Sequence, residues 1–126
     1  MRLLLLATVG GAIGAGARHL VSVGFGRWLG PVFPWSTVFI NILGSVLMGV
    51  LIEALALRFN GSLELRTFLA TGILGGFTTF SAFSLDAYAL ITRGDTAAGL
   101  CYVAASVLLS IVGLYAGLTL TRQVLA

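Results

Sequence analysis

The sequence has no lysine, one cysteine, one histidine and only four acidic residues in 126 positions. Charged residues make up 9% of the chain, whereas soluble domains contain roughly 25%. Together with a hydrophobic content of 59%, this scarcity of charge excludes a soluble protein and indicates an integral membrane protein. One histidine and one cysteine cannot build a zinc site, and no catalytic triad is present, so we expect no enzymatic activity.

The positive charge of the chain comes from arginine alone. The arginines lie mostly at the ends of apolar stretches, which favours contact with lipid headgroups over binding of nucleic acid. Cys101 lies inside an apolar stretch, where we expect a buried thiol that serves packing. The N-terminal leucines resemble a secretory signal with a cleavage site at residues 15–17, but cleavage would leave only three spans. We therefore expect the first span to be retained.

Four stretches are long and apolar enough to cross a membrane, for which a helix needs about 20 residues. They cover residues 3–22, 35–57, 67–91 and 97–121. The connections between them contain glycine, proline and charged residues, and none is long enough to separate domains. We expect the first connection to hold Gly24, Gly26, Arg27, Gly30, Pro31 and Pro34. The sequence thus predicts an all-α membrane protein with a single four-helix transmembrane domain over residues 1–126.

The arginines are almost evenly divided between the two sides of the membrane. With four spans, both termini lie on one side. That side would hold Arg2, Arg58, Arg66 and Arg122, and the other side Arg18, Arg27 and Arg93. Because arginine asymmetry sets the orientation of a membrane protein, this near-balance predicts insertion in both orientations. Four short helices cannot enclose a pathway alone, so we expect an antiparallel homodimer.

The third span contains an unusual segment, Gly75-Gly76-Phe77-Thr78-Thr79-Phe80-Ser81-Ala82-Phe83-Ser84. Glycines and paired threonines are poor material for a plain lipid-facing helix. Irregular backbone is tolerated inside a bilayer only where protein or a watery cavity covers it. Phe80 and Phe83 would share one face of a continuing helix. Their ring edges carry partial positive charge and would favour an anion without binding it too tightly.

Polar residues recur every four positions in the second span, at Thr37, Asn41 and Ser45. This spacing places all three on one helical face. The carboxamide of Asn41 lies well inside the hydrocarbon region and has to be satisfied by hydrogen bonds. It either joins neighbouring helices or lines a solute pathway, and both interpretations stand equally on the sequence alone.

The fourth span carries a similar series, Tyr102, Ser106 and Ser110. A row of hydroxyl groups on one face would replace water around a permeating ion. Alternatively, each serine hydroxyl donates to the carbonyl four residues earlier, as serine often does in helices. Three hydroxyls in register, with a polar stripe on another helix, make the two interpretations about even.

Glycines at four-residue spacing, Gly10 with Gly14 and Gly113 with Gly117, favour close contacts between helices. No acidic residue lies at the centre of a span, which disfavours a proton-coupled exporter. Of the two acidic residues within spans, Asp86 is better placed for such a role than Glu53, and neither is well placed. Arg18, near the end of the first span, would reach the membrane interface or line a vestibule.

Three motifs follow one another along the chain: Gly10-Gly11-x-x-Gly14-Ala15-x-x-Arg18, then Asn41-x-x-Gly44, then residues 75–83. Together they resemble the Fluc (CrcB) family of bacterial fluoride channels. The resemblance covers essentially the whole chain in length, number of spans and motif order. The third motif is the specific one, because glycine patterns are common in membrane helices.

This resemblance implies an antiparallel, dual-topology homodimer in the bacterial inner membrane, with two pores that passively export fluoride. The residues that match the fluoride path are Asn41, Phe80, Phe83, Thr37, Tyr102, Ser106 and Ser110. Arg18 matches the arginine near the vestibule. The resemblance also implies a third helix that is broken near its middle. The backbone carbonyls of Gly75 and Thr78 match positions at this break that hold a structural Na⁺ ion at the dimer axis. The implied partners are therefore fluoride, Na⁺, a second copy of the chain and the lipid bilayer.

One position departs from the family pattern, which usually has threonine or serine where this chain has Ala82. Ser81 or Ser84 is a candidate to replace the missing hydroxyl. Two other classes of protein share the size of this chain: a small four-helix multidrug exporter and a membrane scaffold that transports nothing. The exporter would lose transport in Asp86→Asn or Glu53→Gln, and the scaffold would show no flux in liposomes.

Overall fold

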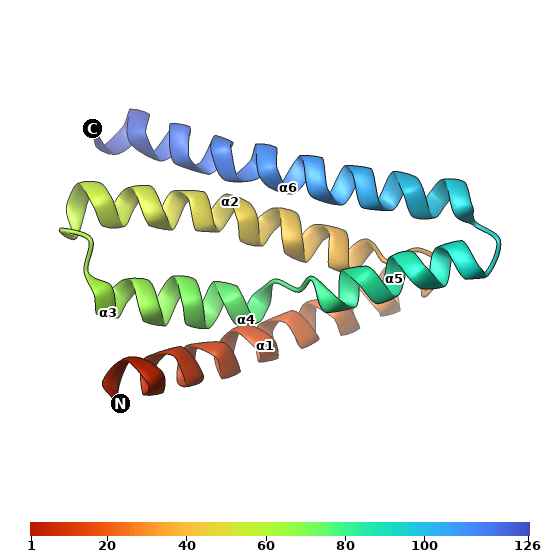
Figure 1. Ribbon diagram of the computed structural model, residues 1–126, viewed down its shortest axis with the longest axis horizontal. Coiled ribbons are helices and arrows are strands. Elements are labelled where there is room, and N and C mark those ends of the chain that lie inside the picture. The colour runs from red at the N-terminus through yellow and green to blue at the C-terminus, as the bar shows by residue number, and fades with distance from the viewer.

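The computed structural model describes residues 1–126 and is entirely helical. Four long helical segments run roughly along one axis (Figure 1). They are α1 (Arg2–Leu29), α2 (Trp35–Arg58), the composite third segment from Leu63 to Thr92, and α6 (Thr96–Leu125). All four are long and apolar enough to cross a membrane, so the chain is a multi-pass membrane protein. Both termini lie at the same end of the bundle, as expected for four spans (Figure 1).

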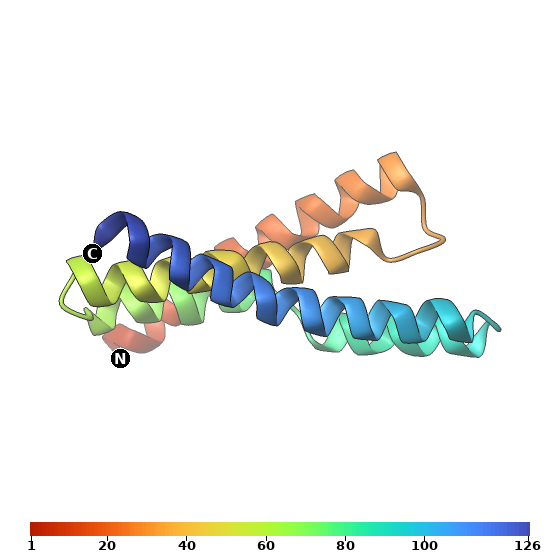
Figure 2. The same ribbon diagram turned by 90° about the horizontal axis from the view of Figure 1, so that it is seen from above.

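The first helix is longer than its sequence predicts. α1 continues through Gly24, Gly26 and Arg27 and ends at Gly30, whose φ of 75° is one that glycine adopts readily. The expectation that these residues belong to the first connection was wrong. Isolated glycines weaken a helix by about 1 kcal/mol each without ending it, and the first proline comes only at position 31. The connection is therefore short, and the end of α1 leans away from α5 and α6 (Figure 2).

The third segment is interrupted, as the sequence predicts. It begins with the short helix α3 (Leu63–Leu65), continues as the π-helix η1 (Arg66–Leu74), and reaches α4 (Gly75–Phe77). The chain is then non-helical until α5 (Ser81–Thr92) begins. Thr78 is extended, with φ −76° and ψ 160°, and this backbone conformation ends the helix. Figure 1 shows the break near the middle of the bundle.

Close backbone contacts hold the first half of the broken segment against α1. A Cβ atom at Gly14 would overlap the carbonyl oxygen of Ile73 and the backbone nitrogen of Phe77. Gly10 lies similarly close to the backbone of Phe68 and Gly72. Small residues let helices approach in this way, and many weak backbone contacts then accumulate. The four-residue glycine spacing in α1 therefore positions the segment that leads into the break.

Polar contacts join the helix ends on both sides of the bundle. At the end with the termini, Arg58 donates to the carbonyl oxygen of Leu125, and Arg122 pairs with the buried Glu53. At the other end, Arg93 binds the carbonyl oxygen of Val32 and the carboxylate of Asp95.

Cys101 was expected to be buried, but it is exposed on α6. The neighbouring Leu100 is also turned outward, so an apolar stretch did not indicate burial.

Candidate functional site

The side chain of Asn41 holds the break in the third segment. Its Nδ2 group donates to the carbonyl oxygen of Thr79 at 2.8 Å, and its Oδ1 accepts from the backbone N–H of Thr79 at 2.9 Å. Because this peptide unit presents both a donor and an acceptor, only one orientation of the carboxamide satisfies it. Asn41 therefore joins α2 to the third segment, which confirms the first sequence interpretation. It also faces a cavity, and its place in a solute pathway stays a prediction.

The neighbouring residues of the break are held in a similarly specific way. The methyl group of Thr78 occupies the space where a Cβ atom of residue 44 would lie, so Gly44 admits the break against α2. The hydroxyl of Thr79 accepts from the backbone N–H of Ala82 at 3.2 Å and caps the first turn of α5. The spacing Asn41-x-x-Gly44 thus supplies both the hydrogen bonds and the space that the interrupted backbone needs.

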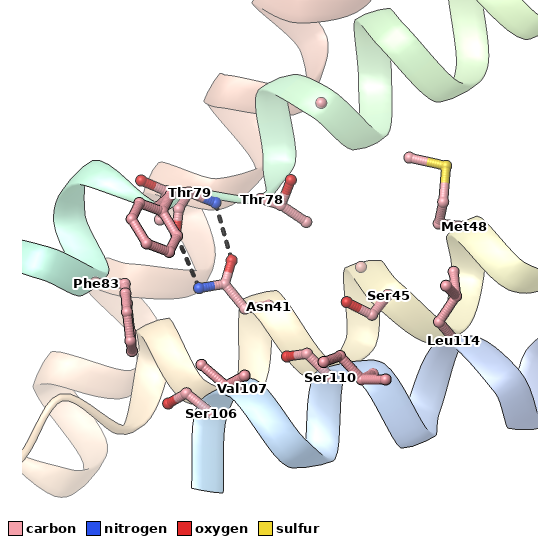
Figure 3. A pocket seen from close by; sticks show the side chains of 14 residues that line it. Asn41, Ser45, Met48, Thr78, Thr79, Phe83, Ser106, Val107, Ser110 and Leu114 are labelled. Atoms are coloured by element: carbon pink, nitrogen blue, oxygen red, sulfur yellow. Dashed lines mark hydrogen bonds between the residues drawn. The ribbon is translucent and has the colours of Figure 1, made fainter. Parts of the chain in front are cut away.

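A cavity of about 490 Å³ lies beside this break, between α2, α6 and the third segment (Figure 3). None of its lining residues is charged. The lining comprises Asn41, Gly44, Ser45, Met48, Gly75, Thr78, Thr79, Phe80, Phe83, Ser106, Val107, Ser110, Ile111 and Leu114. Five of the residues that the sequence indicated for a pathway meet here, namely Asn41, Phe80, Phe83, Ser106 and Ser110.

The two phenylalanines lie next to each other although the helix does not continue through them. Phe80 precedes α5 and Phe83 lies in its first turn, and their ring centroids are 5.3 Å apart. Phe83 is 7% exposed and packs against the ring of Tyr102, whereas Phe80 is 75% exposed. One ring is therefore held by this chain alone, and the other projects from it.

The hydroxyl groups of Ser106 and Ser110 are shielded from solvent and have no hydrogen-bond partner. Five other hydroxyls of the chain do bond to the carbonyl four residues earlier, namely those of Thr8, Thr78, Ser84, Thr92 and Thr119. The alternative that the serines of the fourth span satisfy themselves in this way was therefore wrong. A buried hydroxyl without a partner costs about 1–3 kcal/mol, which a water molecule or an anion would offset.

Thr37 and Tyr102 do not line this cavity. Both hydroxyls donate to the same carboxylate oxygen of Asp86, at 2.8 Å from Thr37 and 3.1 Å from Tyr102. Sequence reasoning weighed Asp86 only as an exporter carboxylate and missed this role. The sequence did contain a clue to this role, because the second and fourth spans each have a polar residue, Thr37 and Tyr102, at a depth similar to that of Asp86. Asp86 therefore ties α5 to α2 and α6 next to the phenylalanines.

A second, smaller cavity of about 220 Å³ lies on the other side of the break. It is lined by Ala15, Arg18, His19, Ser22, Thr37, Ile40, Thr79 and Ala82. The Nε of Arg18 is buried here without a hydrogen-bond partner. Thr79 lines both cavities and so stands between them. The cationic side chain and the uncharged cavity are therefore adjacent but separate.

The missing hydroxyl at Ala82 is not replaced by its neighbours. Ser84 donates to the carbonyl oxygen of Phe80, and the Ser81 oxygen lies 3.5 Å from that of Thr79. Both serines are exposed, and neither lines either cavity. The side of the smaller cavity that Ala82 forms is therefore apolar.

The carbonyl oxygens of Gly75 and Thr78 accept no hydrogen bond from the chain, because the break removes the N–H groups that would follow in a helix. Neutral oxygens of this kind are hard ligands.

Glu53 is fully engaged, since Arg122 donates to both of its oxygens at 2.7 and 3.2 Å. This carboxylate lies near the end of α2, far along the helix from Asn41.

These features together define a class of protein. A chain with four membrane-spanning helices places an uncharged cavity, with unpaired hydroxyl donors and aromatic rings, beside an interrupted helix. Ion channels use such weak and repeated contacts, because an ion has to leave each site as easily as it enters. The arrangement is that of a membrane channel.

The chain belongs to the CrcB-like protein family, also described as Camphor Resistance (CrcB), whose family model matches residues 5–118. A relative from Chelativorans sp. (strain BNC1), named fluoride-specific ion channel FluC, is 56% identical over 97% of this chain and 98% of its own. The Rhodospirillum centenum protein of the same name is 51% identical over the full length of both chains. A third, from Mesorhizobium japonicum, is 55% identical over 95% of this chain. The family resemblance seen in the sequence is confirmed, as is the expectation that the chain is not an enzyme.

Proposed function

We propose that this chain is a fluoride-selective channel that passively exports fluoride across the bacterial inner membrane. The observation that carries the proposal is the pair of buried, unpartnered hydroxyls of Ser106 and Ser110 in the cavity beside Phe80 and Phe83. Fluoride is small and strongly hydrated, so it enters a low-dielectric site only where donors replace its water. Serine hydroxyls without a protein acceptor are available for this task. The names of the relatives support the same anion.

The aromatic rings of the cavity also favour fluoride. The positive edges of Phe80 and Phe83 supply a diffuse field that favours an anion. A full charge inside the pathway would bind fluoride too tightly for release, and the cavity lining contains none. Arg18, in the smaller cavity, is the vestibule residue that raises the local anion concentration. Thr37 and Tyr102 serve the path through Asp86, which holds them beside it.

The functional unit in this proposal is an antiparallel homodimer with two pores. Two observations support it. Phe80 is 75% exposed and lines a cavity that the single chain leaves partly open. A large aromatic ring in that position would be covered by a second copy. The arginines of the two membrane sides also number four and three, which favours insertion in both orientations.

A structural Na⁺ ion fits the same dimer. The carbonyl oxygens of Gly75 and Thr78 have no donor within the chain, and two copies would bring four such oxygens together. Neutral oxygens of this hardness suit Na⁺ better than a transition metal. When bound, the ion would join the two broken helices. It takes no part in the movement of fluoride.

The test is fluoride efflux from liposomes that contain only this protein. The vesicles are loaded with potassium fluoride, and a potassium ionophore releases the counter-charge. We expect rapid loss of fluoride, and retention in matched vesicles loaded with potassium chloride. Retention of fluoride by folded, reconstituted protein would overturn the proposal and favour an exporter or a scaffold.

A further inference from the structure

Within the proposed fluoride pathway, we infer that Ser45 is a third hydroxyl donor, one helical turn beyond Ser110. Ser45 lines the larger cavity together with Ser106 and Ser110. Its position four residues after Asn41 places it on the same face of α2. Ser45 belongs to the polar face of α2 with Thr37 and Asn41, but it lies in none of the three motifs, and the resemblance gives it no role.

Several of the polar groups around the cavity already have hydrogen-bond partners, and only a few donors are free. Asn41 uses its carboxamide for the backbone of Thr79, which leaves it one N–H group. Thr37 and Tyr102 donate their hydroxyl protons to Asp86. In contrast, the hydroxyls of Ser106 and Ser110 have no partner, and Ser45 makes no hydrogen bond to the carbonyl of Asn41 or to any other group of the chain.

Ser45 lies further along the proposed pathway than Ser110. α2 and α6 run in the same direction (Figure 1). Gly113 lies against Ile42 and Val46, and Gly117 lies against Val46 and Val50. This register places Ser110 at about the level of Asn41. Ser45 is four residues further along, and a helix rises about 1.5 Å per residue, so it lies about 6 Å beyond that level.

The surroundings of Ser45 differ on its two sides. Figure 3 shows the hydroxyls of Ser45 and Ser110 directed toward the side of the cavity on which Asn41 lies. In the same register Leu114 lies at the level of Ser45 and Met48 lies beyond it, and neither side chain offers a donor. Ser45 is therefore the last hydrogen-bond donor before the apolar end of this cavity. An anion that leaves Ser110 toward that end would otherwise lose its last protein contact.

This inference depends on the proposed function and assigns a role within it. Ser45 would donate a hydrogen bond to an anion between the level of Ser110 and the apolar end of the cavity. This bond would replace part of the anion's hydration shell there. Its effect on transport should resemble that of one charge-assisted hydrogen bond. We expect Ser45→Ala to lower the initial rate of fluoride efflux about tenfold. A hydrogen bond of this kind raises the binding constant for an anion by about one to two powers of ten.

The experiment compares Ser45→Ala, Ser45→Thr and the matched control Ser36→Ala in fluoride-loaded liposomes. Ser36 lies on the same helix but lines neither cavity. Ser45→Thr keeps the hydroxyl and should retain most of the wild-type rate, and Ser36→Ala should match the wild type. Each variant is also compared with the wild type by size-exclusion chromatography and thermal unfolding in detergent, which a purely structural role would change.

The inference is overturned if Ser45→Ala conducts within about twofold of the wild type, or if Ser45→Thr is as slow as Ser45→Ala while both remain dimeric and folded. It is also overturned if the rate of Ser45→Ala falls only in proportion to a loss of folded dimer. Failure of the proposed function is distinguishable, because the wild-type protein itself would then release no fluoride.

Discussion

Asn41 and Thr79, 38 residues apart in the chain, form a two-point contact in which a side-chain amide pairs with a backbone amide. This contact replaces the helical hydrogen bonds that the break removes from the third segment. Unpaired backbone groups are costly inside a membrane, so the interrupted conformation requires such a partner. The same side chain lines the cavity with the two phenylalanines and the serines. Asn41 would therefore couple the stability of the break to the chemistry of the proposed pathway.

Asn41→Asp should test this coupling. The substitution keeps one acceptor for the N–H of Thr79 but replaces the donor to the Thr79 carbonyl with a repelling oxygen. It also adds negative charge to an anion pathway. We expect fluoride efflux from liposomes to fall at least about a hundredfold, which corresponds to about 2.7 kcal/mol. A normal rate would show that Asn41 lies outside the conducting path.

Phe80→Ile and Phe83→Ile should both abolish or strongly reduce fluoride flux, because each removes the ring edges that face the anion. Their effects on stability should differ. Phe83 is buried against Tyr102, so its substitution should cost about 1–3 kcal/mol of unfolding free energy. Phe80 is mostly exposed in the single chain. Thermal unfolding of the detergent-solubilised protein, measured alongside efflux, separates the two contributions. Equal flux in the wild type and both variants would contradict the role of the rings.

Asp86→Ala and Asp86→Asn should differ in stability. The alanine leaves the hydroxyls of Thr37 and Tyr102 without their acceptor, and each unpaired group costs about 1–3 kcal/mol. The asparagine keeps one oxygen that can accept from both, so we expect most of the stability to remain. Thermal unfolding of both variants in the same detergent gives the comparison. If the two variants unfold at the same temperature, the Asp86 contacts contribute little to the fold.

Gly14→Ala and Gly16→Ala form a matched pair on α1. A Cβ atom at Gly14 would overlap the backbone of Ile73 and Phe77, whereas nothing lies within 4 Å of the corresponding atom at Gly16. We expect Gly14→Ala to destabilise the protein by at least about 2 kcal/mol through overpacking. Gly16→Ala should be neutral or stabilising by up to about 1 kcal/mol, because alanine favours helix. The yield of folded protein on size-exclusion chromatography is the measurement, and equal yields would contradict the close contact.

Part of the site was predictable because it depends on local sequence. Glycines and paired threonines in an apolar stretch indicated the break, and residues four apart on α2 and α6 indicated two polar faces. The rotation of those faces relative to their neighbours was not predictable. Tyr102, Ser106 and Ser110 lie on one face, yet only the two serines line the larger cavity. Tyr102 instead points to Asp86, because the helices are packed closely enough at that level for its longer side chain to reach the carboxylate.

The sequence by itself determined that the chain lies in a membrane, that it crosses four times, and that its third span is irregular. These properties follow from hydropathy, chain length and backbone preference, which act over a few neighbouring residues. Only the tertiary structure decided which polar groups satisfy one another: Asn41 with Thr79, Asp86 with Thr37 and Tyr102, and Glu53 with Arg122. Those pairs are separated by 16 to 69 residues in the chain. Their formation depends on helix packing, and packing leaves unpaired the hydroxyls that we propose to bind an anion.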